Sequence, residues 1–111
     1  MKVFIDSKRL NVHASGDYNP ATNELIVKKG STVSSTITTS KSFRGRNSII
    51  EMRNANVNKG IVVRDVSFRS SSTAANFITG NSTNGLIAWK TESGKTIAEV
   101  IKQAGERNAE Q

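Results

Sequence analysis

Seven basic residues between positions 41 and 69 carry the clearest chemical signal in the sequence. The same window holds only two acids, Glu51 and Asp65, so it contains +5 of the net charge of +7. Five of the seven are arginine, whose guanidinium group binds phosphate or guanine in a bidentate manner. A solvated basic face is the alternative explanation. The seven are Lys41, Arg44, Arg46, Arg53, Lys59, Arg64 and Arg69.

Residues 69–73 offer a second set of groups that could meet an anion. Arg69 precedes a run of hydroxyl side chains, and we expect Ser71 or Ser72 to cap a helix there. The free amides at a helix N-terminus attract negative charge, although an ordinary solvated cap is equally compatible with this pattern. We therefore predict that phosphates are held by five cations, with four polar residues beside them. The cations are Arg44, Arg46, Lys59, Arg64 and Arg69, and the neighbours are Ser71, Ser72, Asn84 and Lys90.

Catalytic and metal-binding patterns are absent from the sequence. His13 is the only histidine, there is no cysteine, and the acids lack the spacing that holds a divalent metal. Gly80 and Gly85 bracket a polar loop. The Lys-Ser/Thr pair that a phosphate-binding P-loop requires does not follow it. We expect no catalytic residue, no metal and no cofactor.

The order of the strands and helices that we expect around these residues predicts an α+β fold. N-terminal antiparallel strands, about three or four of them, are followed by three short helices interleaved with a hairpin and a further strand. The expected early strands are 3–5, 10–14, 24–29 and 31–38, with a turn at 19–23. The expected later elements are a helix from Asn47 or Ser48 to Gly60, a hairpin of 61–63 and 66–68, a helix from Ser71 or Ser72 to Gly80, and a strand 86–90.

The last expected helix begins at Thr96, where Thr96 and Glu99 have the spacing of a capping box. We expect Asn84-Gly85 to form a tight turn with Gly85 in the left-handed conformation. Trp89 either fills the core, which its strand position favours, or stacks on a base from an exposed face.

Length and composition indicate one domain. The chain has 111 residues, enough to bury a modest core, and we assign residues 1–105 to a single domain and 106–111 to a disordered tail. No apolar run has the roughly 20 residues that a membrane span needs. We therefore expect a soluble cytoplasmic protein, a monomer, without membrane contact.

Three stretches together resemble a known family. They are NELIVKKGSTV (23–33), NSIIEMRNANVNKGIVV (47–63) and SSSTAANFITGNSTNGLIAWK (70–90). The chain resembles, over about residues 3–102, the domain of unknown function appended to the C-terminus of GIY-YIG-type nucleases and other restriction-related bacterial proteins. It is more distantly similar to the RAMA domain. The family pattern often has Pro in place of Ser71 and an aromatic residue in place of Leu86.

The resemblance implies an accessory module of restriction, modification or repair systems that binds DNA. It does not imply a nuclease, because the sequence has no GIY or YIG segment. We therefore predict a non-catalytic nucleic-acid-binding module that prefers DNA to RNA. The alternative is a protein-interaction or regulatory module that partners a separate enzyme, with strand 31–38 as a free edge for β-pairing.

Overall fold

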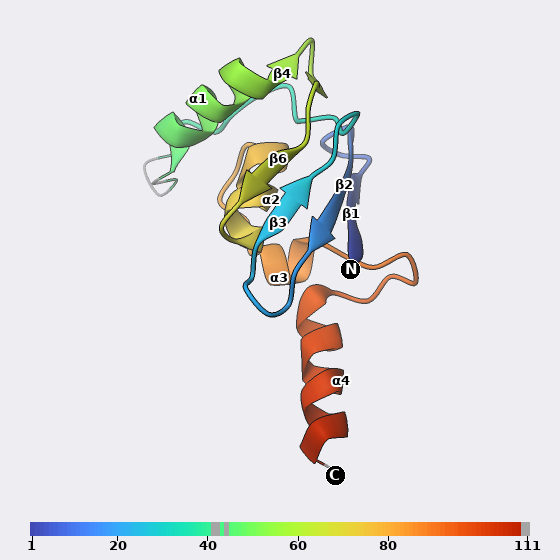
Figure 1. The fold of residues 1–111 in the computed structure, drawn as a ribbon. Helices are drawn as coiled ribbons and strands as arrows, with labels where there is room; N and C mark the ends of the chain where they lie inside the picture. The colour runs from blue at the N-terminus through green and yellow to red at the C-terminus, as the bar shows by residue number, and fades with distance from the viewer. Residues whose placement is uncertain (41–42, 44, 110–111) are drawn as a thin grey trace.

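A four-stranded antiparallel sheet lies at the centre of the molecule (Figure 1). The computed structural model describes residues 1–40, 43 and 45–109, with side chains described as far as residue 104. The strand order is β1-β2-β3-β6, and every neighbouring pair is antiparallel. The strands are β1 (Lys2–Ser7), β2 (Val12–Tyr18), β3 (Leu25–Val27) and β6 (Val66–Phe68).

Alternation of side chains explains why these segments form strands with one buried face. Successive residues of a strand point to opposite sides of the sheet. In β1, for example, Val3 and Ile5 are buried whereas Lys2 and Asp6 are exposed. The inward residues of the other strands are Val12, Ala14, Gly16, Tyr18, Leu25, Val27, Val66 and Phe68.

Helix α2 (Ser71–Thr79) packs on the buried face of the sheet. The rings of Phe77 on α2 and Phe68 on β6 lie 5.1 Å apart, centre to centre. Trp89 is fully buried and packs beside Gly16, where a Cβ atom would lie 3.5 Å from the indole and 2.8 Å from Leu25 Cδ2. The expectation that Trp89 fills the core is therefore confirmed. Gly16 has no side chain, which leaves room beside the sheet for the indole.

The ladder between β3 and β6 continues past their ends in the same register. Thr32 pairs with Ile61, and the amide of Val33 donates to the carbonyl of Gly60 at 3.0 Å. Beyond it lies a small two-stranded sheet of β4 (Val57–Asn58) and β5 (Ile61–Val62). A hairpin thus exists in this region, but the expected pairing of 61–63 with 66–68 is wrong, because β5 pairs with β4 and β6 pairs with β3.

The Ser/Thr-rich segment 31–38 is not the strand that its pattern predicts. Apart from the bridge at Thr32, its amides bind carbonyls of separate elements: those of Ser34 and Thr38 donate to Ile78 and Gly80, both at 2.8 Å. The segment is therefore held between the ladder and the end of α2, and it does not have the strand conformation that the expected β-pairing edge needs.

Helix α1 (Arg46–Asn56) projects from the sheet together with β4 (Figure 1). Its N-cap is Gly45, without a side-chain hydrogen bond, so neither Asn47 nor Ser48 caps it as expected. It ends four residues before Gly60, which lies instead in the turn between β4 and β5 with a φ of +79°.

Helix α2 begins one residue earlier than predicted. Its N-cap is Ser70, whose Oγ accepts the amide of Thr73 at 3.1 Å, and it ends at Gly80 in the left-handed conformation, as expected. A short helix, α3 (Gly85–Ala88), replaces most of the predicted strand 86–90. Asn84 caps it by accepting the amide of Leu86 at 3.0 Å, and Gly85 does not have a positive φ.

Helix α4 (Ile97–Ala109) extends away from the sheet (Figure 1). Thr96 Oγ1 accepts the amide of Glu99 at 3.1 Å, which confirms the predicted cap. Ile97 is buried, whereas Ile101 is 42% exposed. The helix includes residues 106–109 of the predicted tail, and residues 110 and 111 lie outside the described part of the chain.

The predicted α+β class is confirmed, and the residues that the structure describes form four helices and a small second sheet beside the main one. In the described part of the chain, no helix combines the length and the apolar character needed to cross a bilayer.

Candidate nucleic-acid interface

The predicted phosphate-binding residues do not form one surface. Lys59 lies in the β4–β5 turn at one end of the ladder, and Arg69 follows β6 at its other end. Extended chain rises about 3.3 Å per residue, so the ten residues from Lys59 to Arg69 can separate the two backbones by up to about 33 Å. Arg44 lies outside the described residues.

Three of the predicted neighbours hold the fold together at the start of α2. The carbonyl of Ser71 accepts the indole N–H of Trp89 at 3.0 Å, and Ser71 is buried. The hydroxyl of Ser72 accepts the amide of Gly85 at 3.0 Å, while Asn84 caps α3. The Ser-rich and Asn-Gly stretches thus join α2, α3 and Trp89, and these polar groups already have partners within the protein.

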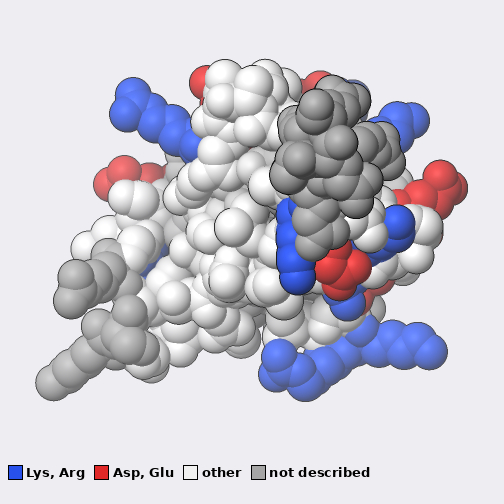
Figure 2. Space-filling model, turned by 90° about the horizontal axis from the view of Figure 1, so that it is seen from below, with Lys and Arg blue, Asp and Glu red and all other residues white. Residues whose placement is uncertain are grey.

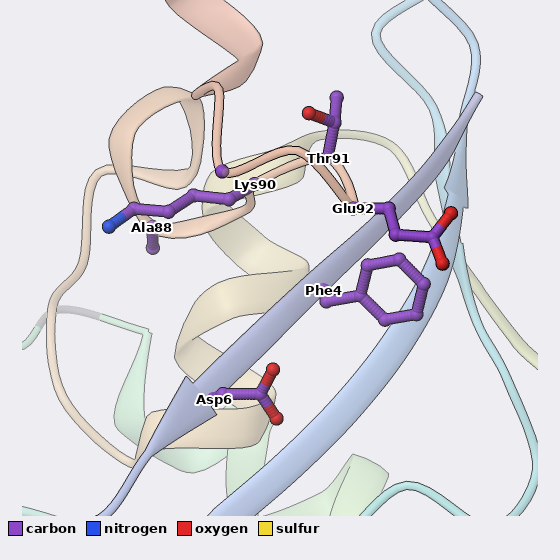
Figure 3. A pocket seen from close by; sticks show the side chains of 7 residues that line it. Phe4, Asp6, Ala88, Lys90, Thr91 and Glu92 are labelled. Atoms are coloured by element: carbon purple, nitrogen blue, oxygen red, sulfur yellow. The ribbon is translucent and has the colours of Figure 1, made fainter.

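Lys90 lies at the β1 edge of the sheet, where its backbone forms two hydrogen bonds with Phe4, of 2.7 and 2.9 Å. A hollow of about 440 Å³ opens beside it, lined in part by Asp6 and Glu92. In Figure 3 both carboxylates lie on the same side of β1 as the ring of Phe4, and the amino group of Lys90 points away. Acidic surroundings disfavour a phosphate here, and Lys90 is separate from the other predicted cations.

Charges on the face seen from the α4 end are mixed. In Figure 2 some Lys and Arg side chains stand at the rim and others lie nearer the middle beside Asp or Glu side chains. Two cations elsewhere also have acidic partners. Within the described residues, the N-terminal amine of Met1 pairs with Asp17 and Lys28 pairs with Asp65, while the Nδ1 of His13 contacts Asp6.

The structure does bring together the basic residues of α1, β4, β5 and the adjoining turns. We call residues 45–64 the α1–β4–β5 unit. It contains four basic residues and one acid, Glu51, and none of these five takes part in an ion pair within the described residues. The four basic residues are Arg46, Arg53, Lys59 and Arg64.

Arg46 and Arg64 lie near opposite ends of α1. The Nε of Arg46, at the first position of the helix, donates to the carbonyl of Thr38 at 2.9 Å. The Nη1 of Arg64 donates to the carbonyl of Ala55 and, at 3.0 Å, to the side-chain oxygen of Asn56. A helix rises about 1.5 Å per residue, so these anchor points are roughly 14 Å apart along α1. Both side chains remain at least partly accessible to solvent.

Arg53 was not among the predicted site residues, yet it is the most constrained cation of the unit. Its Nε and one Nη2 hydrogen donate to the carbonyls of Phe77 and Ile78, at 2.9 and 3.2 Å. The other bonds reach the carbonyl and hydroxyl of Ser34, at 2.9 and 3.0 Å. Burial lowers the pKa of Arg53 from its ordinary value to about 10. A sequence signal existed, because Arg53 lies one turn after Ile49 on the apolar face of α1.

The residues considered for metal binding do not gather into a cluster in the described structure. His13 and Asp6 form an exposed cross-strand pair on the open face of the sheet. No group of three or more His, Cys, Asp or Glu side chains lies close enough to hold a metal ion in the part of the chain that is described.

The fold and its basic projecting unit define a small α+β domain. The chain belongs to the family described as a domain of unknown function (DUF4357), whose family model matches residues 4–101. No curated protein and no solved structure matches the chain. Family membership confirms the resemblance to a domain of unknown function and assigns no activity.

Proposed function

We propose that this domain is a non-catalytic nucleic-acid-binding module, and that the α1–β4–β5 unit is its binding surface. The observation that carries the proposal is the charge of that unit, four basic residues against one acid with no ion pair among them in the described structure. Phosphates would replace the missing carboxylates, and released counterions would contribute to the binding free energy.

The finer part of the proposal is that the nucleic acid is DNA and that the domain acts in the cytoplasm beside restriction, modification or repair enzymes. It is supported by the resemblance to domains appended to GIY-YIG-type nucleases, in stretches that include 47–63. Arg69 and Lys90, far from the unit, have no role in this version of the proposal.

Affinity for duplex DNA should depend steeply on salt. The logarithm of the association constant falls by about 0.9 per phosphate contact for each tenfold rise in salt. With three or four contacts from the unit, we expect a slope of about −3 to −4. RNA duplex and single-stranded DNA, titrated in parallel, report the preference for DNA.

The test measures fluorescence anisotropy of a labelled 20-base-pair duplex at several salt concentrations between about 50 and 200 mM, with wild type and two double variants. Arg46→Gln with Lys59→Asn removes two charges from the unit. Lys95→Gln with Lys102→Gln removes two from the α4 end, so the net charge of both variants is the same.

The first double variant should reduce affinity roughly 10- to 60-fold at 100 mM salt and make the slope shallower by about 1.8. The control pair should change affinity less than about threefold if it makes no phosphate contact. Equal losses in the two variants would show that only net charge matters, and no salt-dependent binding at all would refute the proposal.

A second candidate function, protein interaction, is favoured by a different surface from the one expected. Segment 31–38 does not form the expected edge strand, but Ile87 on α3 and Ile101 on α4 are 52% and 42% exposed. α3 and α4 contact each other, and an apolar patch that spans two such helices would suit a protein partner. Salt-independent behaviour in the DNA titration would favour this candidate.

A further inference from the structure

A hollow of about 440 Å³ is lined by residues of α1, of the β4–β5 hairpin and of segment 33–35. Two of the lining residues are cations and none is an acid. Four other hollows on the described residues each include at least one Asp or Glu. This hollow therefore differs from its neighbours in the sign of its charge. Its lining residues are Val33, Ser34, Ser35, Arg53, Asn54, Val57, Lys59 and Gly60.

Arg53 lines this hollow, and its hydrogen bonds within the described residues do not use all of its N–H donors. A guanidinium group has five N–H donors, and the four hydrogen bonds of Arg53 within the described residues use four of them. Its partners are carbonyl and hydroxyl oxygens, so its positive charge is not neutralised. A half-buried cation with a free donor favours an anion in the adjacent space.

Lys59 also lines the hollow, and its backbone has a conformation that lysine rarely adopts. Lys59 and Gly60 form the two-residue loop between β4 and β5, with φ values of +53° and +79°. Positive φ at both positions is the geometry of a type I′ turn, for which Asn-Gly is strongly preferred. A lysine in place of asparagine strains the turn, and such strain is found where a side chain serves a function.

We infer that this hollow is an oxyanion site that holds one phosphate group between Arg53 and Lys59. The hydroxyl of Ser35 and the amide of Asn54, both exposed and both in the lining, supply neutral donors. The inference rests on the proposed function and deepens it, because it names where one backbone phosphate of the nucleic acid is bound. Free phosphate has the same chemistry and is the other source.

The experiment uses the whole chain labelled with ¹⁵N and titrated first with inorganic phosphate, then with a short DNA duplex. Lys59→Asn removes the charge but installs the residue that the turn prefers, so its melting temperature should equal or exceed that of wild type. Lys59→Arg keeps the charge. Lys102→Asn is the matched control, because it removes a lysine from exposed α4.

Phosphate should shift the amide resonances of Ser35, Asn54 and Gly60 in wild type. Lys59→Asn should weaken phosphate binding at least fivefold and DNA binding by up to about eightfold at 100 mM salt, the contribution of one contact. Lys59→Arg should restore both, and Lys102→Asn should change neither.

Each other outcome decides between the two proposals. If DNA binds wild type and Lys59→Asn equally and phosphate shifts no resonance around the hollow, the oxyanion site is refuted while the proposed function stands. If phosphate binds locally but DNA does not bind, the site holds and free phosphate or a small phosphoester is its ligand. If neither binds, both proposals are overturned.

Discussion

Replacing Gly85 with alanine tests how closely α3 packs on the start of α2. A Cβ atom at Gly85 would lie 2.1 Å from the carbonyl carbon of Ser71, 2.3 Å from its oxygen and 2.4 Å from the amide nitrogen of Ser72. All three are backbone atoms, so no side-chain rotation can relieve the contact. The two helices must separate for the methyl group to fit.

The cost follows from the contacts that this separation breaks. Overpacking a close-packed interior costs about 1–3 kcal/mol. Moving Ser71 also breaks its bond with the indole of Trp89, and a buried donor left without a partner costs about 1–3 kcal/mol more. We expect a loss of about 4 kcal/mol in the free energy of unfolding, a large fraction of the 5–15 kcal/mol typical of a domain. The melting temperature should fall by roughly 15 °C.

Urea unfolding followed by far-ultraviolet circular dichroism measures this loss. Gly45→Ala is the matched control, because Gly45 has an ordinary φ of −90° and a Cβ atom there would meet nothing within 4 Å. It should change stability by less than about 1 kcal/mol. A loss below about 1 kcal/mol for Gly85→Ala would refute the reasoning and show that α3 moves freely on α2.

Two further predictions concern Arg53 and Asp65. Arg53→Met leaves the carbonyls of Phe77 and Ser34 without their donor and should cost about 2–4 kcal/mol in urea unfolding; a change below about 1 kcal/mol would contradict the bonding described. The backbone amide of Lys29 and then the side chain of Lys28 hold the pKa of Asp65 below its ordinary value of 3.8. The lowered pKa means that Asp65 stabilises the fold above pH 3.8 and loses this contribution as the pH falls through its folded-state pKa. The melting temperature of wild type should therefore exceed that of Asp65→Asn at neutral pH, and the difference should shrink below pH 3.8; a constant difference would contradict the assignment.

The buried face of the sheet could be predicted from the sequence because its cause is local. Alternation in residues 2–7 and 12–18 places apolar side chains on one side whatever the partner strand is. The partner of β6 could not be predicted in the same way. Residues 66–68 pair with 25–27, about 40 positions away, and the nearer run 61–63 looked equally suitable as a partner.

For a short apolar run, the sequence pattern does not distinguish a helix from a strand. Leu86-Ile87-Ala88 fits one helical turn as well as a strand, and the decision came from the Asn84 cap and from the contact of Gly85 with Ser71. The glycine was read as a turn residue, but its lack of a side chain serves a close approach between two backbones. That reason depends on tertiary structure.

The candidate site was predictable in composition and not in position. The excess of arginine in 41–69 marked a basic region, and the structure keeps part of it together in the α1–β4–β5 unit while it places Arg69 elsewhere. Arg53 was assigned to an apolar helix face, and its carbonyl partners on α2 lie 24 and 25 residues further along the chain. Side chains that bind distant backbone groups leave little trace in local patterns.

The single tryptophan gives this domain an internal optical probe. Trp89 has no exposed surface and its indole N–H is held by a backbone carbonyl, so its emission should be blue-shifted while the chain is folded and should move to longer wavelength on denaturation. It follows α3, which lies at the end of the main sheet away from α1 and β4 in Figure 1. The emission wavelength of Trp89 should therefore report folding and should not change when a ligand binds the α1–β4–β5 unit. A fluorescence spectrum of an unlabelled sample can then show whether a variant that fails to bind is still folded.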